Sequence, residues 1–337
     1  MHVAELKNIV DDIINFDDVH QSVNAVKKLS GFFNTIAADI TFELSANNEK
    51  NIAGGQALST YHAAACTDDY LRTCYFIKGI FRALTTLQSD FPDRKLNIIY
   101  AGCGPFATLL LPLLPLYNST LVNALLLDIN ASSLQFVEKL ISLLHLEEYN
   151  IKLVEADATK YQIPDGWNTD LFISETMHYG LTAEPQVAIT RNFIPQLLPH
   201  TVFIPSQIHI DMVYTSFGRE PFIKFGQDAS QTTKDKPEPA RLYIDRLFSI
   251  DKNTAEIINS TSIKSRFFPV PQNIEAYPDL CIFTEVTIYE DLTLGTAESL
   301  ITNPYCITSL YHLKAHSEFQ LEYDYSETPK WALKFKN

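Results

Sequence analysis

The hydrophobic pattern changes its period along the chain. Between Val3 and about Leu87, apolar residues return every three or four positions, as on one face of a helix, and Gly54-Gly55 breaks the pattern. From residue 95 onward, short apolar runs of strand length alternate with helical stretches. Because this alternation is typical of βαβ units, we expect an all-helical region over residues 1–94 followed by a parallel sheet.

The expected strands of the parallel sheet are continuous apolar runs, as strands buried on both faces usually are. In chain order they occupy residues 96–100, 121–127, 151–155 and 171–174. Helices are expected from about Phe106 and over residues 131–144. The apolar run over residues 109–129 approaches the length of a membrane span, but Pro112 and Pro115 interrupt it. We interpret it as a helix end, a turn and a buried strand, with no membrane anchor.

After Pro199 the chain becomes rich in β-branched and aromatic residues, some of which alternate with polar ones. Strands are expected over residues 202–204, 207–213, 281–289 and 305–313. We therefore predict an α/β protein with a Rossmann-like domain over residues 95–205 and a mostly-β, barrel-like domain over residues 206–337. The polar segment 227–239 is expected to be a loop or an arm.

Charge and cysteine usage narrow the class of partner. The formal net charge of −14 opposes a phosphate backbone, so nucleic acid is a poor substrate candidate. A cationic partner suits this charge, although solubility alone explains it as well. The five cysteines are odd in number, dispersed and without metal-ligand spacing. We interpret them as free thiols of a reducing compartment, and the N-terminus has no secretory pattern, so the protein is expected to be cytoplasmic.

The candidate chemistry begins where the first expected strand ends. Gly102 and Gly104 follow it in a Gly-x-Gly turn, at the edge where doubly wound sheets bind ligands. Such turns also occur without a ligand. The third glycine of the dinucleotide fingerprint is absent around Phe106, which argues for a nucleoside cofactor without a pyrophosphate. S-adenosylmethionine is the natural candidate.

Two acids follow at the ends of the next strands. Asp128 stands roughly 20 residues beyond the glycines, where a carboxylate can accept hydrogen bonds from both ribose hydroxyls. Asp157, with Ala158 beside it, ends the third strand and is placed to accept a hydrogen bond from the adenine amino group. The structural alternative for Asp157 is a loop carboxylate that caps a helix.

The fourth strand is followed by two glutamates nine residues apart, Glu175 and Glu184. Paired carboxylates match a planar guanidinium, because they accept its N–H groups in pairs. This segment resembles the double-glutamate loop of the protein arginine methyltransferases, with a Ser-Glu, a Met, a Tyr and a second Glu. The resemblance implies that Glu175 and Glu184 clamp the substrate guanidinium and that Met177, His178 and Tyr179 lie beside it.

An upstream segment is similar to the same family. Asp69 and Arg72 match its Asp-x-x-Arg-Thr segment, in which the arginine holds the cofactor carboxylate, so the resemblance gives that role to Arg72. Without the resemblance, the two residues would be read as an i, i+3 surface pair. The family also carries a β-barrel after the sheet and dimerises through an arm. Residues 217–247 are long enough for such an arm and a homodimer, although their composition equally fits a disordered loop.

Some positions depart from the family's pattern. The counterpart of its Thr-His-Trp loop, residues 301–305, keeps Thr302 but has Asn303 and Pro304 next, and His178 replaces a usual glycine. We therefore expect methyl transfer from S-adenosylmethionine to a guanidinium in a small molecule, free arginine first, with arginine in a protein as the alternative. A scaffold protein that has kept the fold is the alternative from another class. Methylation of a carboxylate or hydroxyl would leave the two acids unexplained.

Overall fold

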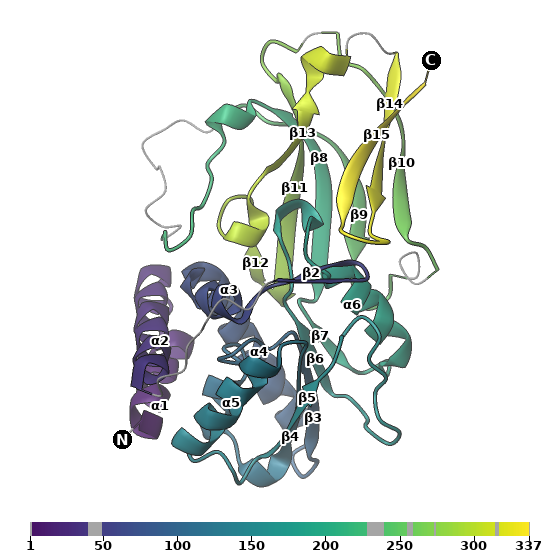
Figure 1. Cartoon of the computed structure of the whole chain (residues 1–337). Helices are drawn as coiled ribbons and strands as arrows, with labels where there is room; N and C mark the ends of the chain where they lie inside the picture. Colours follow the sequence, from purple (N-terminus) through teal and green to yellow (C-terminus); the bar gives the residue numbers. More distant parts are fainter. Residues whose placement is uncertain are drawn as a thin grey trace.

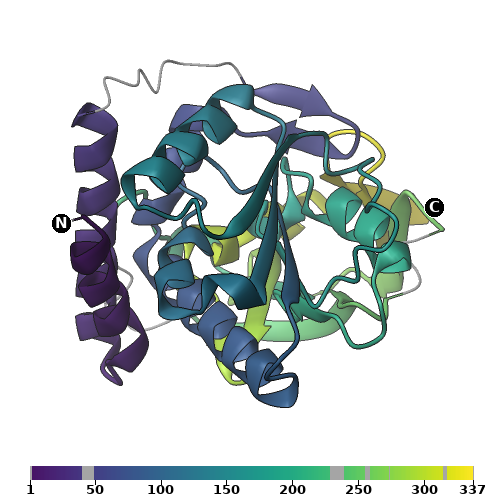
Figure 2. The same ribbon diagram turned by 90° about the horizontal axis from the view of Figure 1, so that it is seen from below.

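The computed structural model describes residues 2–39, 49–227, 239–254, 259–272, 274–313 and 317–336. Its N-terminal part contains the long helices α1 (His2–Asn15), α2 (Val19–Asp39) and α4 (Tyr70–Asp90). Leu6, Val10 and Ile13, which recur at helical spacing, lie on the buried face of α1. Helix α1 lies beside α2 at the N-terminal side of the molecule (Figure 1). Seen from below, α1 and α2 stand outside the helices that flank the sheet (Figure 2). The expected helical N-terminus is confirmed.

A β-hairpin interrupts this helical region, which the sequence pattern does not predict. β1 (Lys50–Ile52) and β2 (Gly55–Ala57) pair antiparallel, and the short helix α3 (Thr60–Ala65) follows. The turn contains Gly54, whose φ of +82° suits a residue without a Cβ. Gly54 and Gly55 therefore break the helical pattern, as expected, and they do so at the turn of a β-hairpin.

The parallel sheet is confirmed, with five strands in the order β5-β4-β3-β6-β7. In chain order they are β3 (Leu96–Ala101), β4 (Val122–Asp128), β5 (Asn150–Glu155), β6 (Leu171–Ser174) and β7 (Val202–Ile204). Helix α5 (Ala131–Leu143) connects β4 to β5, and α6 (Gln186–Phe193) connects β6 to β7. Since all five strands are parallel, the residues that follow them meet at one edge of the sheet.

The prediction of a helix from about Phe106 is wrong. Residues 102–110 form turns, and a short 3-10 helix spans Leu111–Leu116. Pro112 and Pro115 have no N–H to donate, so an α-helical hydrogen-bond ladder cannot run through this segment. Phe106 instead stacks on Phe33 of α2, with 4.8 Å between the ring centroids. The N-terminal helices thus pack against this turn region.

The C-terminal part is mostly β, as expected, and its strands form two antiparallel sheets (Figure 1). The larger sheet contains β8 (Gln207–Thr215), β9 (Leu242–Ile250), β11 (Asp279–Tyr289), β12 (Leu292–Leu294) and β13 (Tyr305–Ser309). The smaller sheet contains β10 (Ser262–Pro269), β14 (Glu318–Asp324) and β15 (Lys330–Lys336). Phe248 packs on Tyr323 and Trp331, with ring centroids 5.6 and 6.0 Å away, and so joins the sheets.

The end of the β part is less regular than its sequence indicates. The strand expected over residues 305–313 ends at Ser309, and a 3-10 helix follows at Leu310–Leu313. Most of the loop or arm expected over residues 227–239 lies outside the described residues. Among the helices that the structure describes, none has both the length and the apolar character needed to cross a membrane.

Candidate active site

A cavity of about 460 Å³ opens at the carboxyl ends of β3, β4 and β6. Its walls come from the N-terminal segment 49–72, from the loops that follow the parallel strands, and from residues 300–303 of the β part. Of the residues singled out from the sequence, the cavity is lined by Arg72, Gly102, Gly104, Asp128, Ala158, Glu175, Met177, His178, Tyr179 and Glu184. The fold therefore brings together candidates from six separate stretches of the chain.

The glycine turn after β3 is tightly built. Gly102 has a φ of +72°, and a Cβ there would lie 2.5 Å from Cγ2 of Thr176. Gly104 has a φ of +65° and donates its N–H to Oδ2 of Asp128 at 2.9 Å. Both positions favour glycine on backbone grounds, and at Gly102 a side chain would also fill the space beside the cavity.

Asp128 and Asn130 form the polar wall at the end of β4. Asp128 is 7% exposed and also accepts the N–H of Asn130 at 2.8 Å, and burial raises the pKa of its carboxyl. The Asn130 amide donates to the carbonyl of Leu58 at 2.9 Å. Its Oδ1 is buried without a hydrogen-bond partner among the described residues. An acceptor in this state suits a ligand that donates hydrogen bonds, such as a nucleoside.

The carboxylate of Asp157 makes its contacts within its own turn. Its Oδ1 accepts hydrogen bonds from the N–H and the hydroxyl of Thr159, at 2.9 and 2.6 Å, and Oδ2 lies 3.4 Å from Nζ of Lys160. The neighbours Ala156 and Ala158 line the cavity, whereas Asp157 is not among its lining residues. Asp157 therefore caps a turn and not a helix, and its two alanine neighbours line the cavity.

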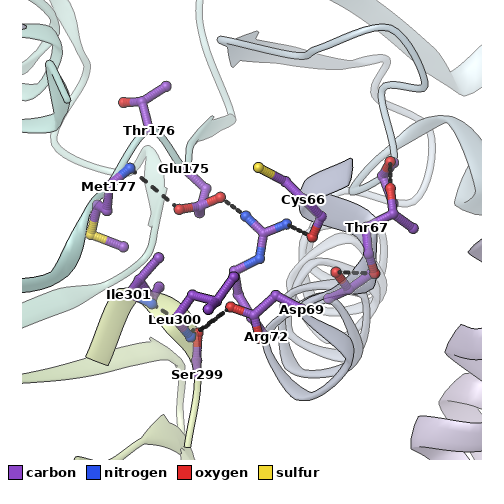
Figure 3. A network of polar contacts seen from close by, with 12 residues as sticks. Cys66, Thr67, Asp69, Arg72, Glu175, Thr176, Met177, Ser299, Leu300 and Ile301 are labelled. Carbon is purple, nitrogen blue, oxygen red and sulfur yellow. Dashed lines mark hydrogen bonds and ion pairs between the residues drawn. The ribbon is translucent and has the colours of Figure 1, made fainter. Parts of the chain in front are cut away.

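Glu175 and Arg72 form a buried ion pair in this cavity (Figure 3). Each side chain is only 6% exposed. Arg72 also donates from Nη2 to the carbonyl of Cys66 at 2.6 Å, and its Nε has no partner among the described residues. Arg72 reaches the pair from the first turn of α4, and Glu175 follows β6 directly. Arg72, which is expected at the cofactor carboxylate, is therefore in contact with Glu175, which is expected in the guanidinium clamp.

Glu184 places a second carboxylate in the same lining. Loss of solvation raises its pKa to about 7, while the positive charge of Arg72 lowers it and the negative charge of Glu49 raises it further. Glu49 lies at the same cavity, where its Oε1 is 3.2 Å from Nδ1 of His62. Glu184 is thus an acid whose charge changes near neutral pH.

The loop between the two glutamates is anchored to the β part. The carbonyl of Gly180 accepts the indole N–H of Trp331 at 2.8 Å, and the carbonyl of Leu181 accepts the hydroxyl of Tyr323 at 2.7 Å. The N–H of Gly180 donates to the hydroxyl of Thr284 at 3.2 Å. Three strands of the β part, β11, β14 and β15, thus fix the middle of this loop.

The β1–β2 hairpin holds the end of the same loop. The N–H of Gln56 donates to the carbonyl of Ala183 at 2.8 Å. A Cβ on Gly55 would lie 2.6 Å from the backbone nitrogen of Pro185, so hairpin and loop are in close contact. Leu181 and Ala183 have φ values of +54° and +63°, a conformation that costs a residue with a Cβ about 1–2 kcal/mol. The anchors therefore hold Glu184 in a backbone that a free loop would not keep.

Solved structures with a similar fold belong to protein arginine methyltransferases. A chain of the Trypanosoma brucei PRMT1 enzyme-prozyme heterotetrameric complex with AdoHcy matches with a TM-score of 0.51 at 14% identity, over 81% of this chain and 92% of that one. PRMT6 matches with a TM-score of 0.53 at 12% identity, over 82% and 99%. This chain has the protein arginine methyltransferase fold. Protein arginine methyltransferase 10 of Arabidopsis thaliana gives 0.49 at 11% identity, over 82% and 97%. No family model and no curated protein matches the sequence.

In this arginine methyltransferase fold, the residues Met177, His178 and Tyr179, which follow Glu175, line the cavity. Met177 is 4% exposed and packs into the core. His178 Nδ1 lies 2.8 Å from the hydroxyl of Thr182, and burial lowers the pKa of the imidazole, which favours the neutral ring. The ring of Tyr179 lies 3.9 Å from that of His178, centroid to centroid. His178 and Tyr179 thus form an uncharged aromatic edge of the cavity.

Asn303, which the sequence analysis expects in place of the histidine of the Thr-His-Trp loop, has a structural role here. Asn303 is 1% exposed, and its side chain accepts the N–H of Ile223 at 2.8 Å and donates to the carbonyl of Ile223 at 2.9 Å. Ile223 lies between Phe222 and Phe225, which both line the cavity. Sequence reasoning missed these phenylalanines, because they belong to no motif and their segment has no periodic pattern.

Asp69 does not form the exposed pair with Arg72 that was the structural alternative for these two residues. It is 5% exposed and accepts hydrogen bonds from the hydroxyl of Ser299 at 2.6 Å and the N–H of Leu300 at 2.9 Å. The surface-pair alternative for Asp69 and Arg72 is therefore wrong, because both residues are buried. Asp69 ties the start of α4 to the β part beside the cavity (Figure 3).

Proposed function

We propose that the protein is an S-adenosylmethionine-dependent N-methyltransferase that acts on the guanidinium of a small molecule of the arginine type, with free arginine as the first compound to test. The observation that carries the proposal is the presence of two carboxylates, Glu175 and Glu184, in one cavity with the nucleoside-type wall of Asp128 and Asn130. Acids at both positions suit a planar cation, and the unpartnered Asn130 Oδ1 suits a nucleoside.

The residues around the cofactor would act through shape and charge. Gly102 and Gly104 allow the backbone to approach the nucleoside, and Asp128 and Asn130 accept hydrogen bonds from its donors. Arg72, with an unpartnered Nε, attracts the carboxylate at the other end of the cofactor. S-adenosylmethionine, when bound, supplies a methyl group on a positively charged sulfur.

The clamp would orient the guanidinium and take up one proton. Glu175 and Glu184 accept N–H groups and turn one nitrogen toward the methyl group, so that catalysis consists largely of positioning and charge complementarity. S-adenosylmethionine would supply the methyl group that this nitrogen receives in place of a proton. The proton displaced from that nitrogen passes to Glu184, whose pKa of about 7 suits a proton acceptor at neutral pH.

The similar solved structures support this proposal. Two of them are named as arginine methyltransferases, and one of these holds AdoHcy, the compound that remains when S-adenosylmethionine has lost its methyl group. Their names favour arginine in a protein as the second candidate substrate. The net charge of −14 is compatible with that candidate, because a basic peptide would be attracted to an acidic protein.

Mass spectrometry tests the proposal directly. The purified protein is incubated with S-adenosylmethionine and either free L-arginine or an arginine-rich peptide, with Glu175→Gln as the control. We expect free L-arginine to gain the mass of one methylene group when it is incubated with the wild-type protein, and to gain nothing with the variant. A product only on the peptide would favour the second candidate. Cofactor binding without any product on guanidino compounds would refute guanidinium methylation.

A further inference from the structure

The cavity carries an aromatic wall whose place is fixed by buried polar contacts. Phe222 and Phe225 line it although they are 39% and 54% exposed, so they lie at its mouth. The two hydrogen bonds of Asn303 to Ile223, which is 2% exposed, hold the backbone between them. These bonds are made within the protein, so the fold itself positions the wall.

A second buried contact holds the start of the same segment. The carboxylate of Glu220 accepts hydrogen bonds from Arg241, at 2.6 to 3.1 Å, and its side chain is 1% exposed. It also accepts the hydroxyl of Thr215 at the end of β8. The segment from Glu220 to Phe225 is therefore bound to the β part at two points.

The charges that line the cavity are strongly unequal. Five acids face it in the described residues, namely Glu49, Asp69, Asp128, Glu175 and Glu184. Arg72 is the one lysine or arginine in that described lining, and the proposed function assigns it to Glu175 and to the cofactor carboxylate. A substrate carboxylate entering here would lose water without gaining a cationic partner, which is costly. An alkyl chain would instead pack against the aromatic rings, and an ammonium group would be attracted by the acids and the ring faces.

We propose that the substrate is a small guanidino compound whose far end carries no carboxylate, and that an amine is favoured there, with the alkyl chain lying against Phe222 and Phe225. This inference rests on the proposed function and narrows its substrate class away from free arginine. Glu49, which the clamp does not use and whose partner is His62 at the cavity, is the acid that receives the amine.

A matched series of compounds tests this inference. 1-Butylguanidine, 4-guanidinobutylamine and 4-guanidinobutanoate share the guanidinium and differ at the far end, and L-arginine completes the series. We expect kcat/KM for the amine to exceed that for the acid and for L-arginine by at least about tenfold, with the neutral compound between them. An acid or L-arginine used as well as the amine would overturn the inference and leave the proposed function standing. Methylation of none of the four would overturn both.

Two variants assign the preference to residues. Glu49→Gln should lower the ratio of kcat/KM between the amine and the neutral compound severalfold, because the acid that meets the ammonium is gone. The control is Glu147→Gln, an exposed glutamate before β5, which should leave that ratio unchanged. Phe222→Ala should raise KM for the whole series more than it lowers kcat, since the wall contributes chain binding. An unchanged ratio in Glu49→Gln would remove the amine from the proposal.

Discussion

The two glutamates of the candidate clamp have different surroundings although they line one cavity. Glu175 is in direct contact with the guanidinium of Arg72, whereas burial raises the pKa of Glu184 to about 7. A carboxyl that titrates near neutral pH can attract a cation when ionised and also take up a proton. Glu175 and Glu184 therefore differ because Arg72 contacts one of them and loss of solvation raises the pKa of the other.

Activity should rise with pH through the titration of Glu184. We expect kcat/KM for a guanidino substrate to increase as the pH passes about 7, because kcat/KM reports groups of the free enzyme and only the ionised acid attracts a guanidinium. Initial rates between about pH 5.5 and pH 9 measure this. The Glu184→Gln variant should lose most of the activity, and its kcat/KM should no longer rise near pH 7. A flat wild-type profile would contradict the assignment.

Stability should change with pH in the opposite direction. The folded protein keeps the Glu184 proton up to about pH 7, whereas an unfolded glutamate releases it near 4.5, so the folded state binds more protons between these values. The free energy of unfolding therefore falls as the pH rises through this window. Denaturant titrations at several pH values measure it. In Glu184→Gln the fall should be smaller, and identical curves for both proteins would show that Glu184 titrates normally.

At the scale of elements, the loop that carries Glu184 depends on two neighbours that the chain supplies from its two ends. The β1–β2 hairpin contacts the end of the loop, and β14 and β15 bond to its middle. Each neighbour can be weakened without touching a clamp carboxylate. The contribution of the supports to catalysis can therefore be separated from that of the acids.

Gly55→Ala should disturb the hairpin and the loop together. The added Cβ would lie 2.6 Å from the backbone nitrogen of Pro185, so backbone must move, and such overpacking costs about 1–3 kcal/mol of stability. We expect methyl transfer to fall at least about tenfold as Glu184 shifts. Gly31→Ala is the matched control, because no atom lies within 4 Å of its Cβ position in α2. Equal activity in both variants would rule out a support role for the hairpin.

Trp331→Phe should loosen the loop from the other side. It removes the N–H that Gly180 accepts and keeps an aromatic ring beside Tyr323, so the expected cost in stability is about 1 kcal/mol. We expect kcat to fall while the affinity for S-adenosylmethionine stays unchanged, measured by steady-state kinetics and calorimetry. Reduced stability with wild-type kcat would show that Trp331 serves the fold alone.

The sequence predicts elements better than it predicts these supports. β3, β4, β6 and α5 could be found because each one leaves a local signal, an apolar run or a helical period. β1 and β2 are three residues long, too short for any period. The bonds from Thr284 and Trp331 to Gly180 join residues 104 and 151 positions apart. No local pattern encodes such a contact.

At the scale of the whole molecule, the cavity belongs to no single part of the fold. Its lining runs from Glu49 to Asn303 and includes the N-terminal segment, the parallel sheet and the β part. A ligand that fills the cavity touches all three and should stabilise them as one unit. The glycine turn can test whether that ligand is the nucleoside cofactor.

S-adenosylmethionine should raise the melting temperature of the protein. At 100 times its dissociation constant, a ligand that binds only the folded state adds about 2.7 kcal/mol, which is several degrees. Gly102→Ala should abolish the shift, because its Cβ would lie 2.5 Å from Cγ2 of Thr176 in a backbone with a φ of +72°. Glu175→Gln should keep most of it. Differential scanning fluorimetry measures all three proteins, and no shift in the wild type would refute cofactor binding.

The bond between Trp331 and Gly180 has a consequence for the order in which the candidate site is completed during synthesis. The ribosome adds Trp331 151 residues after Gly180, when the strands of the parallel sheet have long been available to fold. A nascent chain can therefore hold a complete sheet and both glutamates of the candidate clamp while the loop that presents Glu184 still lacks this anchor. A chain that stops before β15 would keep the two acids and lose the indole N–H that holds Gly180.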